Sequence, residues 1–405
     1  MMKFNQLFKG GLAVAMAATL VACGSNGSTT SQSTGGETAG NSTAAIKIGG
    51  SGPTTGGAAV YGQAVKNAFE LAVEEVNAVG DVQFEARFED DAHDPEKAVT
   101  AYGVLKDWGM QVSIGTTTSG PGQAVSPLYK EDNIFALTPS ASSLAVIYAD
   151  TANASNPYGS VFQMCFTDPN QGVASADYLK AHTDLGSKVG VIWKNDDNYS
   201  TGVHDKFVAE AKEVGLEVVY DGTFESSTEN DFSVQLTQAQ AAGADILFLP
   251  IYYQPASLIL TQANAMNYAP TFFGVDGLDG ILSMENFDTS LAEGVYLLTP
   301  FSADGTDQMT KHFVDEYQKR YGEVPNQFAA DAYDCVYALA QACKAAGITA
   351  DMTPSQVADA LKAEFTKMTF DGITGEQVTW NANGEVSKSP KAVVIKDGVY
   401  VGVQD

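Results

Sequence analysis

The sequence predicts an α/β protein built from two doubly wound lobes, and three observations support this fold class. From Ile46 onward, short apolar runs alternate with amphipathic stretches, as expected for strands of a mainly parallel sheet joined by helices. Acids and glycines stand where helices need caps at their starts and ends. About 360 residues of such units exceed one comfortable sheet, so we expect two lobes.

The elements follow one another in a regular order. Strands are expected at 46–50, 82–90, 112–117, 134–139, 189–194, 216–222, 244–250, 271–277 and 294–300. Helices are expected near 60–79, 95–108, 121–131, 171–183, 202–214, 231–242, 255–267, 307–321 and 327–345. Asp94 precedes a proline and an acid, which marks a helix start, whereas Gly80, Gly215 and Gly243 mark helix ends.

The C-terminal segment has a different pattern. Residues 370–405 contain the turn pairs Asn383-Gly384 and Asp397-Gly398, so we expect strands and hairpins there. In open α/β sheets, ligands bind beyond the carboxyl ends of the strands. Candidate site residues are therefore sought directly after the apolar runs.

The N-terminus predicts export and membrane anchoring. Residues 1–22 carry two lysines, no acid, and an apolar run shorter than the roughly 20 residues of a spanning helix. The run ends in Leu-Val-Ala before Cys23, which resembles a bacterial lipobox that is cleaved before a lipidated cysteine. A buried cysteine after an ordinary signal peptide is the alternative. Residues 23–45 are polar and predict a flexible tether, so we expect an extracytoplasmic protein anchored through lipid on Cys23.

Composition excludes several classes of function. The chain has 49 acidic and 22 basic residues and a formal charge of −27, which disfavours binding to nucleic acid phosphates. Four scattered cysteines are too few for a disulfide framework or a zinc site. The segment 90–94 (DDAHD) is the most metal-like cluster, but it reads as a strand end followed by a helix cap. We expect no metal and no cofactor.

Catalytic motifs are also missing from the sequence. It has no GxSxG elbow and no GxxxxGK[ST] loop, and its four histidines are not spaced with carboxylates as metal ligands. A secreted α/β enzyme such as an amidase is an alternative, but we expect no enzymatic activity.

Three turns of the first half are rich in hydroxyl groups and glycine. They lie at 51–57 (SGPTTGG), 116–122 (TTTSGPG) and 139–143 (PSASS). Each follows an apolar run and enters a helix, where backbone N–H groups and hydroxyls can bind an anionic group such as a carboxylate. The alternative for each turn is that serine or threonine only caps the next helix.

The corresponding turns of the second half are aromatic and acidic. They lie at 196–199 (DDNY), 252–255 (YYQP) and 276–279 (DGLD). Aromatic walls can enclose an apolar or zwitterionic ligand, and a carboxylate beside glycine can meet an ammonium group. The alternative is that Asp276 caps a turn and that the tyrosines pack at the lobe surface.

These motifs occur in one collinear series that carries a family resemblance. It includes IKIGGSGPTTGGAAVYG, DDAHDPEKA, SIGTTTSGPGQAVSPLY, TPSASS, DPNQG, FLPIYYQPA, FFGVDG and AADAYDCVYALAQA. Over about residues 46–385 the series resembles the branched-chain amino-acid type (leucine/isoleucine/valine-binding) of substrate-binding protein from ABC importers. The resemblance implies a type I periplasmic-binding-protein fold, with two α/β lobes that close on a ligand about three hinge strands.

The resemblance also implies lobe boundaries. The N-terminal lobe would comprise 46–164 and 300–375, and the C-terminal lobe 165–299 and 376–405. The crossings would fall near 162–168, 297–302 and 373–380.

The same resemblance assigns site residues. Ser119 takes the place of a carboxylate-binding serine, Ser140 that of a backbone contact, and Ser142 that of a hydroxyl touching both charged groups of the ligand. Asp276 stands where the family has an acid for the ammonium. The remaining candidates are Ala141, in the same turn as Ser140, and the pocket aromatics Tyr61, Tyr199, Tyr252 and Tyr253, where the neighbouring pair leaves the register open. The sequence departs from better-known members at 163–165 (QMC), so side-chain specificity is left open.

The expected function is therefore that of a monomeric, lipid-anchored receptor that captures an amino acid and delivers it to an ABC permease. A branched-chain or other aliphatic amino acid is expected. The alternatives are the same fold binding an amide, urea or an aromatic acid, and a sensor that reports the ligand instead of feeding transport.

Overall fold

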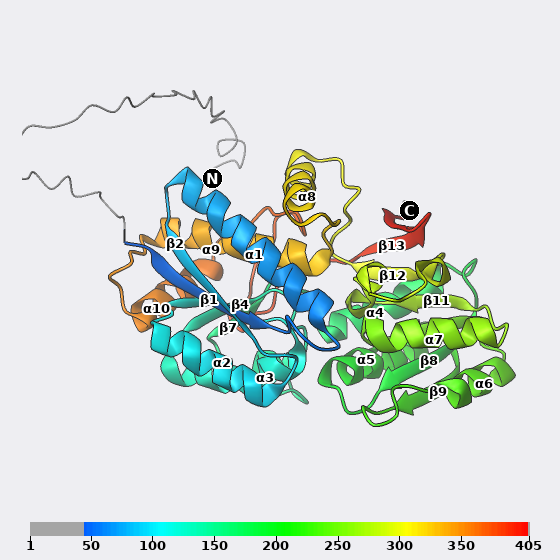
Figure 1. Ribbon diagram of the computed structural model, residues 1–405. Helices are drawn as coiled ribbons and strands as arrows, with labels where there is room; N and C mark the ends of the chain where they lie inside the picture. Colours follow the sequence, from blue (N-terminus) through cyan, green and yellow to red (C-terminus); the bar gives the residue numbers. More distant parts are fainter. Residues whose placement is uncertain (1–43, 404–405) are drawn as a thin grey trace, which may run out of the picture. The chain divides into compact units, whose positions relative to one another are not determined.

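Two separate sheets organise the computed structural model, which describes residues 44–403 (Figure 1). The first sheet has five parallel strands in the order β2-β1-β3-β4-β7. The bounds are β1 (Ile46–Gly52), β2 (Phe84–Asp90), β3 (Val112–Thr116), β4 (Phe135–Thr138) and β7 (Val161–Gln163). Strand β1 lies between β2 and β3 with Ile48 fully buried, as the apolar run in the sequence predicts.

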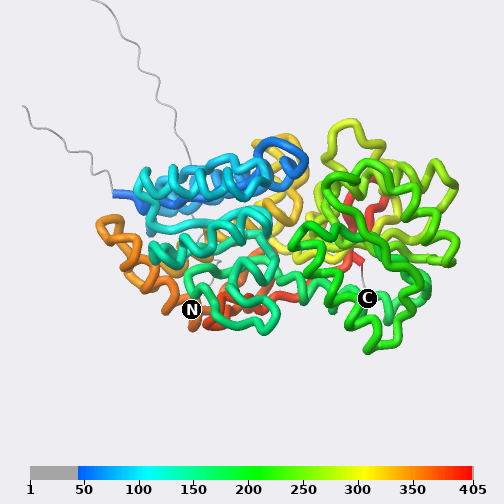
Figure 2. Tube along the Cα trace, turned by 90° about the horizontal axis from the view of Figure 1, so that it is seen from below, coloured from blue at the N-terminus to red at the C-terminus, as the bar shows by residue number. Residues whose placement is uncertain are grey.

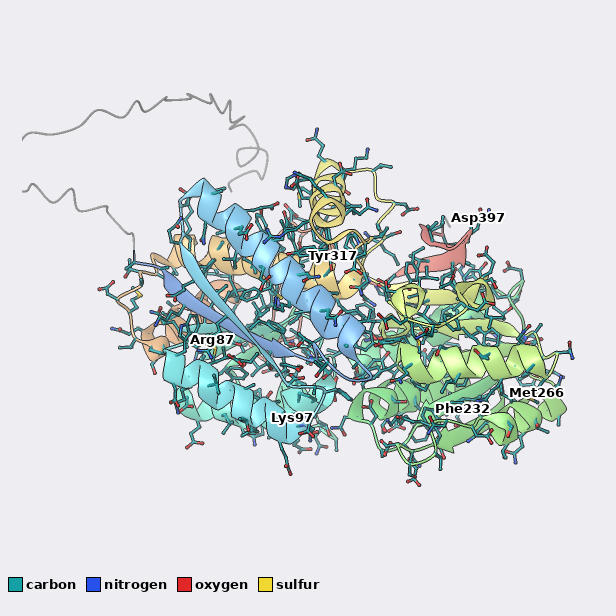
Figure 3. The ribbon with its side chains drawn as sticks, in the orientation of Figure 1. Arg87, Lys97, Phe232, Met266, Tyr317 and Asp397 are labelled. Carbon is teal, nitrogen blue, oxygen red and sulfur yellow. The ribbon has the colours of Figure 1, made fainter. Side chains whose placement is uncertain are left out.

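The second sheet has seven strands in the order β14-β13-β12-β11-β10-β8-β9. The bounds are β8 (Lys188–Lys194), β9 (Glu217–Phe224), β10 (Ile246–Leu249), β11 (Thr271–Gly274), β12 (Tyr296–Thr299), β13 (Lys391–Lys396) and β14 (Val399–Gly402). Its strands are parallel except for β13, which is antiparallel to both β12 and β14. Asp397, labelled in Figure 3, and Gly398 both have positive φ, which confirms the predicted hairpin turn.

Helices pack in pairs on these sheets (Figures 1 and 2). Around the five-stranded sheet, in what is called the first lobe below, α1 contacts α9, α2 contacts α3, and α8 contacts α1. Around the seven-stranded sheet, in what is called the second lobe, α4 contacts α5, and α6 contacts α7. The bounds are α1 (Ala59–Val79), α2 (Pro95–Trp108), α3 (Ser119–Asp132), α4 (Asp168–Ala181), α5 (Asn198–Val214), α6 (Ser233–Ala242), α7 (Tyr253–Ala265), α8 (Gln308–Tyr321), α9 (Gln327–Ala346) and α10 (Pro354–Phe365).

Local capping explains where several helices start and stop. Asp94 accepts hydrogen bonds from the N–H groups of Glu96 and Lys97 at the start of α2, as predicted. Gly80 has φ of 86° after α1, a conformation that glycine adopts without steric cost. The described cysteines, Cys165, Cys335 and Cys343, are buried free thiols.

The structure differs from the sequence prediction in three places. Helix α10 was not predicted, although Thr353 and Gln356 form a capping box before it. The short strands β5 (Tyr148–Asp150), β6 (Ser155–Pro157) and β7 were also missed, because runs of three residues carry no readable period. Between 370 and 386 the structure has isolated bridges instead of the strands that were predicted.

Helix starts differ in a way that matters for function. Helices α3, α4, α5 and α7 begin two to four residues earlier than predicted, directly after their strands. Ser119, Asp168 and Tyr253 are consequently first residues of helices, and Tyr199 is the second residue of α5. The turns that the sequence identified are therefore short, and their side chains are held by helical backbone.

The segments between the lobes are fixed by polar contacts. The backbone N–H of Gln163 donates to the carbonyl of Gly384 at 2.9 Å, and the Trp380 indole donates to the Gln163 carbonyl at 2.7 Å. These bonds tie 380–384 to β7 of the first sheet. Lys388 lies 2.7 Å from the Asp331 carboxylate, and both side chains are almost fully buried. The lobe boundaries given above stay a prediction.

Candidate ligand-binding site

The carboxyl ends of strands from both sheets meet around a small cavity. Its lining comes from both lobes, as expected for a site at the strand ends of open α/β sheets. The lining residues are Tyr61, Thr117, Thr118, Ser140, Ser142, Tyr199, Tyr252, Asp276, Gly277 and Phe328.

The first-lobe wall is rich in hydroxyl groups. Ser140 lines the cavity, and its hydroxyl donates to the Thr117 carbonyl at 2.5 Å. Ser142 lines it as well and is 1% exposed. Ser119 is buried at the first turn of α3, where its Oγ accepts a hydrogen bond from the Ser143 N–H at 3.2 Å. Ser119, which was predicted to bind the ligand carboxylate, does not line the cavity.

Ala141 occupies a different position from its neighbours. Its N–H donates to the Thr138 hydroxyl at 3.2 Å, and its carbonyl accepts from the Gln163 amide at 2.8 Å. Ala141 is fully buried and does not line the cavity. Its hydrogen bonds hold the turn in shape, whereas Ser140 and Ser142 present groups to the cavity.

The second-lobe wall contains one buried carboxylate. Asp276, in the short 3₁₀ helix η3 (Asp276–Leu278), is 4% exposed. Its Oδ2 accepts a hydrogen bond from the Gln171 amide at 2.9 Å. Oδ1 completes no hydrogen bond of normal geometry, although the Tyr199 hydroxyl lies close enough to act on the carboxyl group. Burial raises the pKa of Asp276 to about 6, although Tyr199 and Gln171 oppose that shift. A buried acceptor without a partner is costly, so the site is suited to a ligand that brings a positively charged donor.

Aromatic rings close the cavity and connect the two lobes. The Tyr61 hydroxyl donates to the Gly277 carbonyl at 2.5 Å and accepts from the Tyr253 N–H at 3.1 Å. Tyr199 accepts from the Gly277 N–H at 3.0 Å and stacks on Tyr252 with ring centroids 5.1 Å apart. These contacts surround the space between the hydroxyl wall and Asp276.

The structure answers the question of register at the neighbouring tyrosines. Tyr252 lines the cavity and lies edge-on to Tyr61 at 5.3 Å. Tyr253 is the first residue of α7, lies edge-on to Tyr61 at 5.0 Å, and does not line the cavity. Its hydroxyl accepts from the Val60 N–H at 3.4 Å. Tyr253 therefore supports Tyr61 from behind.

Sequence reasoning missed several residues that surround the cavity. Thr117 and Thr118 lie within the quoted hydroxyl-rich turn but were not singled out. Phe328, in the first turn of α9, packs on Tyr61 with centroids 4.3 Å apart. Gln171 lay in the quoted DPNQG segment. It was already placed in the first turn of the helix expected near 171–183, but the sequence does not show that its amide reaches Asp276.

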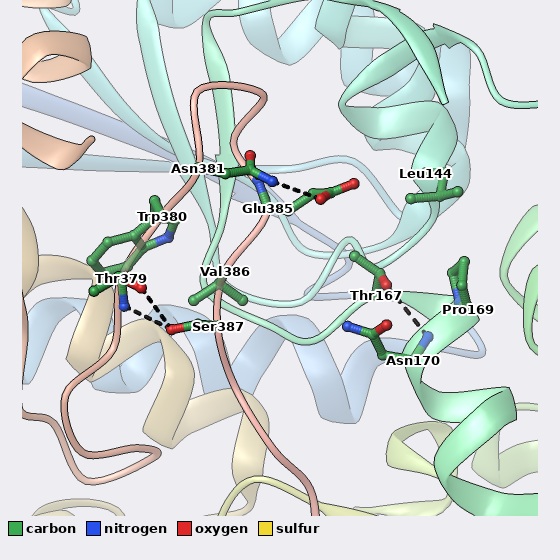
Figure 4. Close-up of a pocket in the computed structure, with 10 residues that line it drawn as sticks. All are labelled: Leu144, Thr167, Pro169, Asn170, Thr379, Trp380, Asn381, Glu385, Val386 and Ser387. Atoms are coloured by element: carbon green, nitrogen blue, oxygen red, sulfur yellow. Dashed lines mark hydrogen bonds between the residues drawn. The ribbon is translucent and has the colours of Figure 1, made fainter. Parts of the chain in front are cut away.

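A second hollow lies beside the crossing segments (Figure 4). It is lined by Leu144, Thr167, Pro169, Asn170, Thr379, Trp380, Asn381, Glu385, Val386 and Ser387. Many of its polar groups bond to one another: Thr167 to the Asn170 backbone, and the Asn381 amide to the Glu385 carboxylate at 2.7 Å. It lacks the unpartnered buried carboxylate of the inter-lobe cavity, so the latter is the better candidate site.

Two further observations concern the described residues only. Within 44–403, no group of three or more histidine, cysteine or acidic side chains is placed to hold a metal ion. Over the same range, no helix is both long and apolar enough to cross a membrane.

Comparison with known proteins decides the family. A model described as periplasmic binding protein matches residues 45–398. The chain belongs to this periplasmic binding protein family. The predicted family resemblance and the two-lobed type I fold are thereby confirmed.

The relatives are similar over most of their length. The leucine-, isoleucine-, valine-, threonine-, and alanine-binding protein of Pseudomonas aeruginosa is 25% identical over 82% of this chain and 84% of its own. A Leu/Ile/Val-binding protein homolog of Brucella melitensis is 28% identical over 89% and 94%. A branched-chain amino acid transporter substrate-binding protein of Streptococcus pneumoniae, solved with isoleucine, is 26% identical, covers 89% of this chain and 100% of its own, and superposes with a TM-score of 0.75.

Proposed function

We propose that this periplasmic binding protein captures an amino acid, in the first place one with a branched aliphatic side chain, and delivers it to an ABC permease. The observation that supports the proposal is a buried, partly unpartnered carboxylate, Asp276, facing a hydroxyl-rich wall across one inter-lobe cavity. An α-amino acid carries an ammonium group that can pair with Asp276 and a carboxylate that can bind to the hydroxyl-rich wall. The names of the relatives point to the same ligand class.

Binding would require no bond chemistry, because each lobe supplies a different part of the site. The ligand carboxylate would dock on Ser119, Ser140 and Ser142 of the first lobe. Asp276 would then take the ammonium as the second lobe closes, which stabilises the closed form by the difference in affinity between the two states. The aromatic wall would enclose the side chain and exclude water.

A thermal-shift and calorimetric screen tests this proposal. Residues 24–405 are unfolded and refolded to remove carried-over ligand, then mixed with single amino acids, short amides, urea and aromatic carboxylates. A ligand at 100 times its Kd should stabilise the fold by about 2.7 kcal/mol. Stabilisation by aliphatic amino acids supports the proposal, whereas stabilisation only by ligands without an ammonium contradicts the role of Asp276.

We further propose an extracytoplasmic protein that is retained at the membrane by lipid on Cys23 and acts as a monomer. Cys23, the signal peptide and the tether lie outside the described residues, so this rests on the sequence. Globomycin treatment or Cys23→Ala should release the protein from the membrane fraction. Unchanged fractionation of the Cys23→Ala variant would contradict the anchor without affecting the binding site.

A further inference from the structure

Asp168, which the site described above does not use, is a buried acid with no hydrogen-bond partner. It is the first residue of α4 and is fully buried. Neither carboxylate oxygen completes a hydrogen bond of normal geometry. The Ser142 and Ser143 hydroxyls nevertheless lie close enough to act on the carboxyl group. These two hydroxyls lower the pKa of Asp168, but the cost of burying an ionised carboxylate is the larger effect.

The packing around Asp168 is specific for its side chain. Helices α4 and α5 pack against each other, and a Cβ added to Gly202 on α5 would lie 2.7 Å from Asp168 Oδ2. The Asp168 N–H donates to the Ser142 carbonyl at 3.1 Å across the first crossing between the lobes. The Asp168 carboxyl group is therefore held between Gly202 of α5 and the hydroxyl-rich turn of the first lobe that contains Ser142.

The charges near Asp168 oppose its ionisation. The charged groups acting on it are Asp276 in η3 and Asp197 ahead of α5, and both are acidic. The cation Lys194 acts on Asp197, and burial lowers the pKa of the neighbouring His93. The N-terminus of α4 favours a negative charge, but Thr167 already caps this helix. Burial and the two acids together raise the pKa of Asp168 well above its ordinary range.

The neighbouring uncharged groups do not change this balance. Tyr252, on the cavity wall, and Cys165, on the first crossing, are the other titratable groups on which Asp168 acts. Burial raises the pKa of both, so neither provides a charge that could stabilise an ionised Asp168. Ser142 and Ser143 can each donate or accept.

We propose that Asp168 is a positioning residue that stays a neutral acid and donates its proton to the Ser142 hydroxyl oxygen. With its oxygen engaged in this way, the Ser142 hydroxyl directs its own hydrogen to the ligand carboxylate. The inference rests on the proposed function, because it specifies how the carboxylate end of that site is oriented. It also gives two buried acids opposite charge states: Asp276, on the cavity wall, is ionised for the ammonium, and Asp168, outside the cavity lining, is neutral.

Ligand affinity of three variants tests the donor role. Asp168→Asn keeps a neutral donor of the same shape, so its Kd at pH 7 should stay within about threefold of wild type. Asp168→Ala removes the donor and should weaken binding by about tenfold. In a Ser142→Ala background the difference between Asp168→Asn and Asp168→Ala should disappear. A tenfold or larger loss in Asp168→Asn, or a difference that persists in Ser142→Ala, would overturn the inference.

The pH dependence of stability tests the neutral state without any ligand. An acid whose pKa is raised by folding destabilises the fold as pH rises above its unfolded pKa of about 3.9. The Tm of Asp168→Asn should therefore equal that of wild type near pH 4 and exceed it increasingly toward pH 8. A lower Tm for Asp168→Asn at pH 7 would show an ionised, stabilised Asp168 and overturn the inference.

Carbon NMR of protein labelled at its aspartate side chains gives a direct measurement. The signal that disappears in Asp168→Asn should have the position of a neutral acid at pH 7, and the position of an ionised carboxylate would contradict the inference. These readouts remain informative if no amino acid binds. In that case the proposed function fails, while the charge state of Asp168 is still decided.

Discussion

The first-lobe face of the cavity presents hydroxyl groups, and the second-lobe face presents tyrosine rings and one carboxylate. On the first face the Ser140 hydroxyl is held by a hydrogen bond within the lobe. On the second face Asp276 keeps one oxygen without a partner. The first face is therefore preorganised for an anion, whereas the second carries an electrostatic cost that a cationic group would relieve. The two faces together favour a zwitterion over either ion alone.

Removing the charge of the second face should give the largest effect. Asp276→Asn keeps the shape and the Gln171 contact but loses the ion pair with the ammonium. We expect amino acid binding to weaken by about 100-fold or more in calorimetry. Because burial raises the pKa of Asp276 to about 6, the same variant should have a higher Tm than wild type at pH 7 but not at pH 4.

Asp279→Asn is the matched control for that variant. Asp279 is equally buried, and its Oδ2 accepts from the Gln327 N–H at 2.8 Å, but it does not line the cavity. The affinity of the Asp279→Asn variant for the amino acid should stay near that of wild type. Equal losses in the two variants would mean that any buried charge near η3 matters, and the assignment of the ammonium to Asp276 would be wrong.

Hydroxyl removal on the first face should have a smaller effect, and the two serines should differ. Ser119→Ala removes the hydroxyl that we propose donates to the ligand carboxylate, so we expect about tenfold weaker binding. Ser140→Ala removes a hydroxyl that already donates to the Thr117 carbonyl, so its loss should cost less affinity. Calorimetry on both variants checks the order. A larger loss in Ser140→Ala would show that its hydroxyl rearranges on binding.

Sequence reasoning identified both faces because their chemistry is carried by short runs directly after strands. Ser140, Ser142 and Asp276 were all found in this way and line the cavity. The sequence did not show which side chain within a run faces the cavity. A helix start displaced by one residue decides whether Tyr252 or Tyr253 faces the cavity, and helix boundaries depend on tertiary packing more than on propensity.

Residues that act through burial could not be found from the sequence. Asp168 lies in the DPNQG run, which was quoted only for the family resemblance and which precedes or overlaps the helix expected near 171–183. Nothing in that run shows that Gly202, more than 30 residues later, would enclose Asp168. The buried pair of Lys388 with Asp331 likewise joins segments 57 residues apart. Such contacts depend on the packing of distant elements, whereas strand-end motifs are local.

Low pH should weaken ligand binding through the second face, because Asp276 becomes protonated. The ammonium requires an ionised Asp276, whose pKa lies at about 6 without ligand because of burial. Affinity should therefore be constant above this pH and fall by about tenfold for each pH unit below it. Calorimetry between pH 5 and pH 8 measures this dependence. A profile that is flat down to pH 5 would mean that Asp276 stays ionised through contacts other than the ligand.

Weakening the contact between the faces should give the smallest effect. Tyr61→Phe removes the hydroxyl that donates to the Gly277 carbonyl and accepts from the Tyr253 N–H, so the closed form loses hydrogen bonds that the open form cannot make. We expect the Kd to rise by about three- to tenfold, because each of the two lost bonds contributes about 0.5 kcal/mol to closure. Tyr253→Phe is the control, since its hydroxyl makes only the longer 3.4 Å contact with Val60.

The loss of affinity in Tyr61→Phe should appear mainly in the dissociation rate measured by stopped flow, because closure follows docking on the first face. An unchanged dissociation rate in Tyr61→Phe would show that ligand contacts alone hold the lobes together.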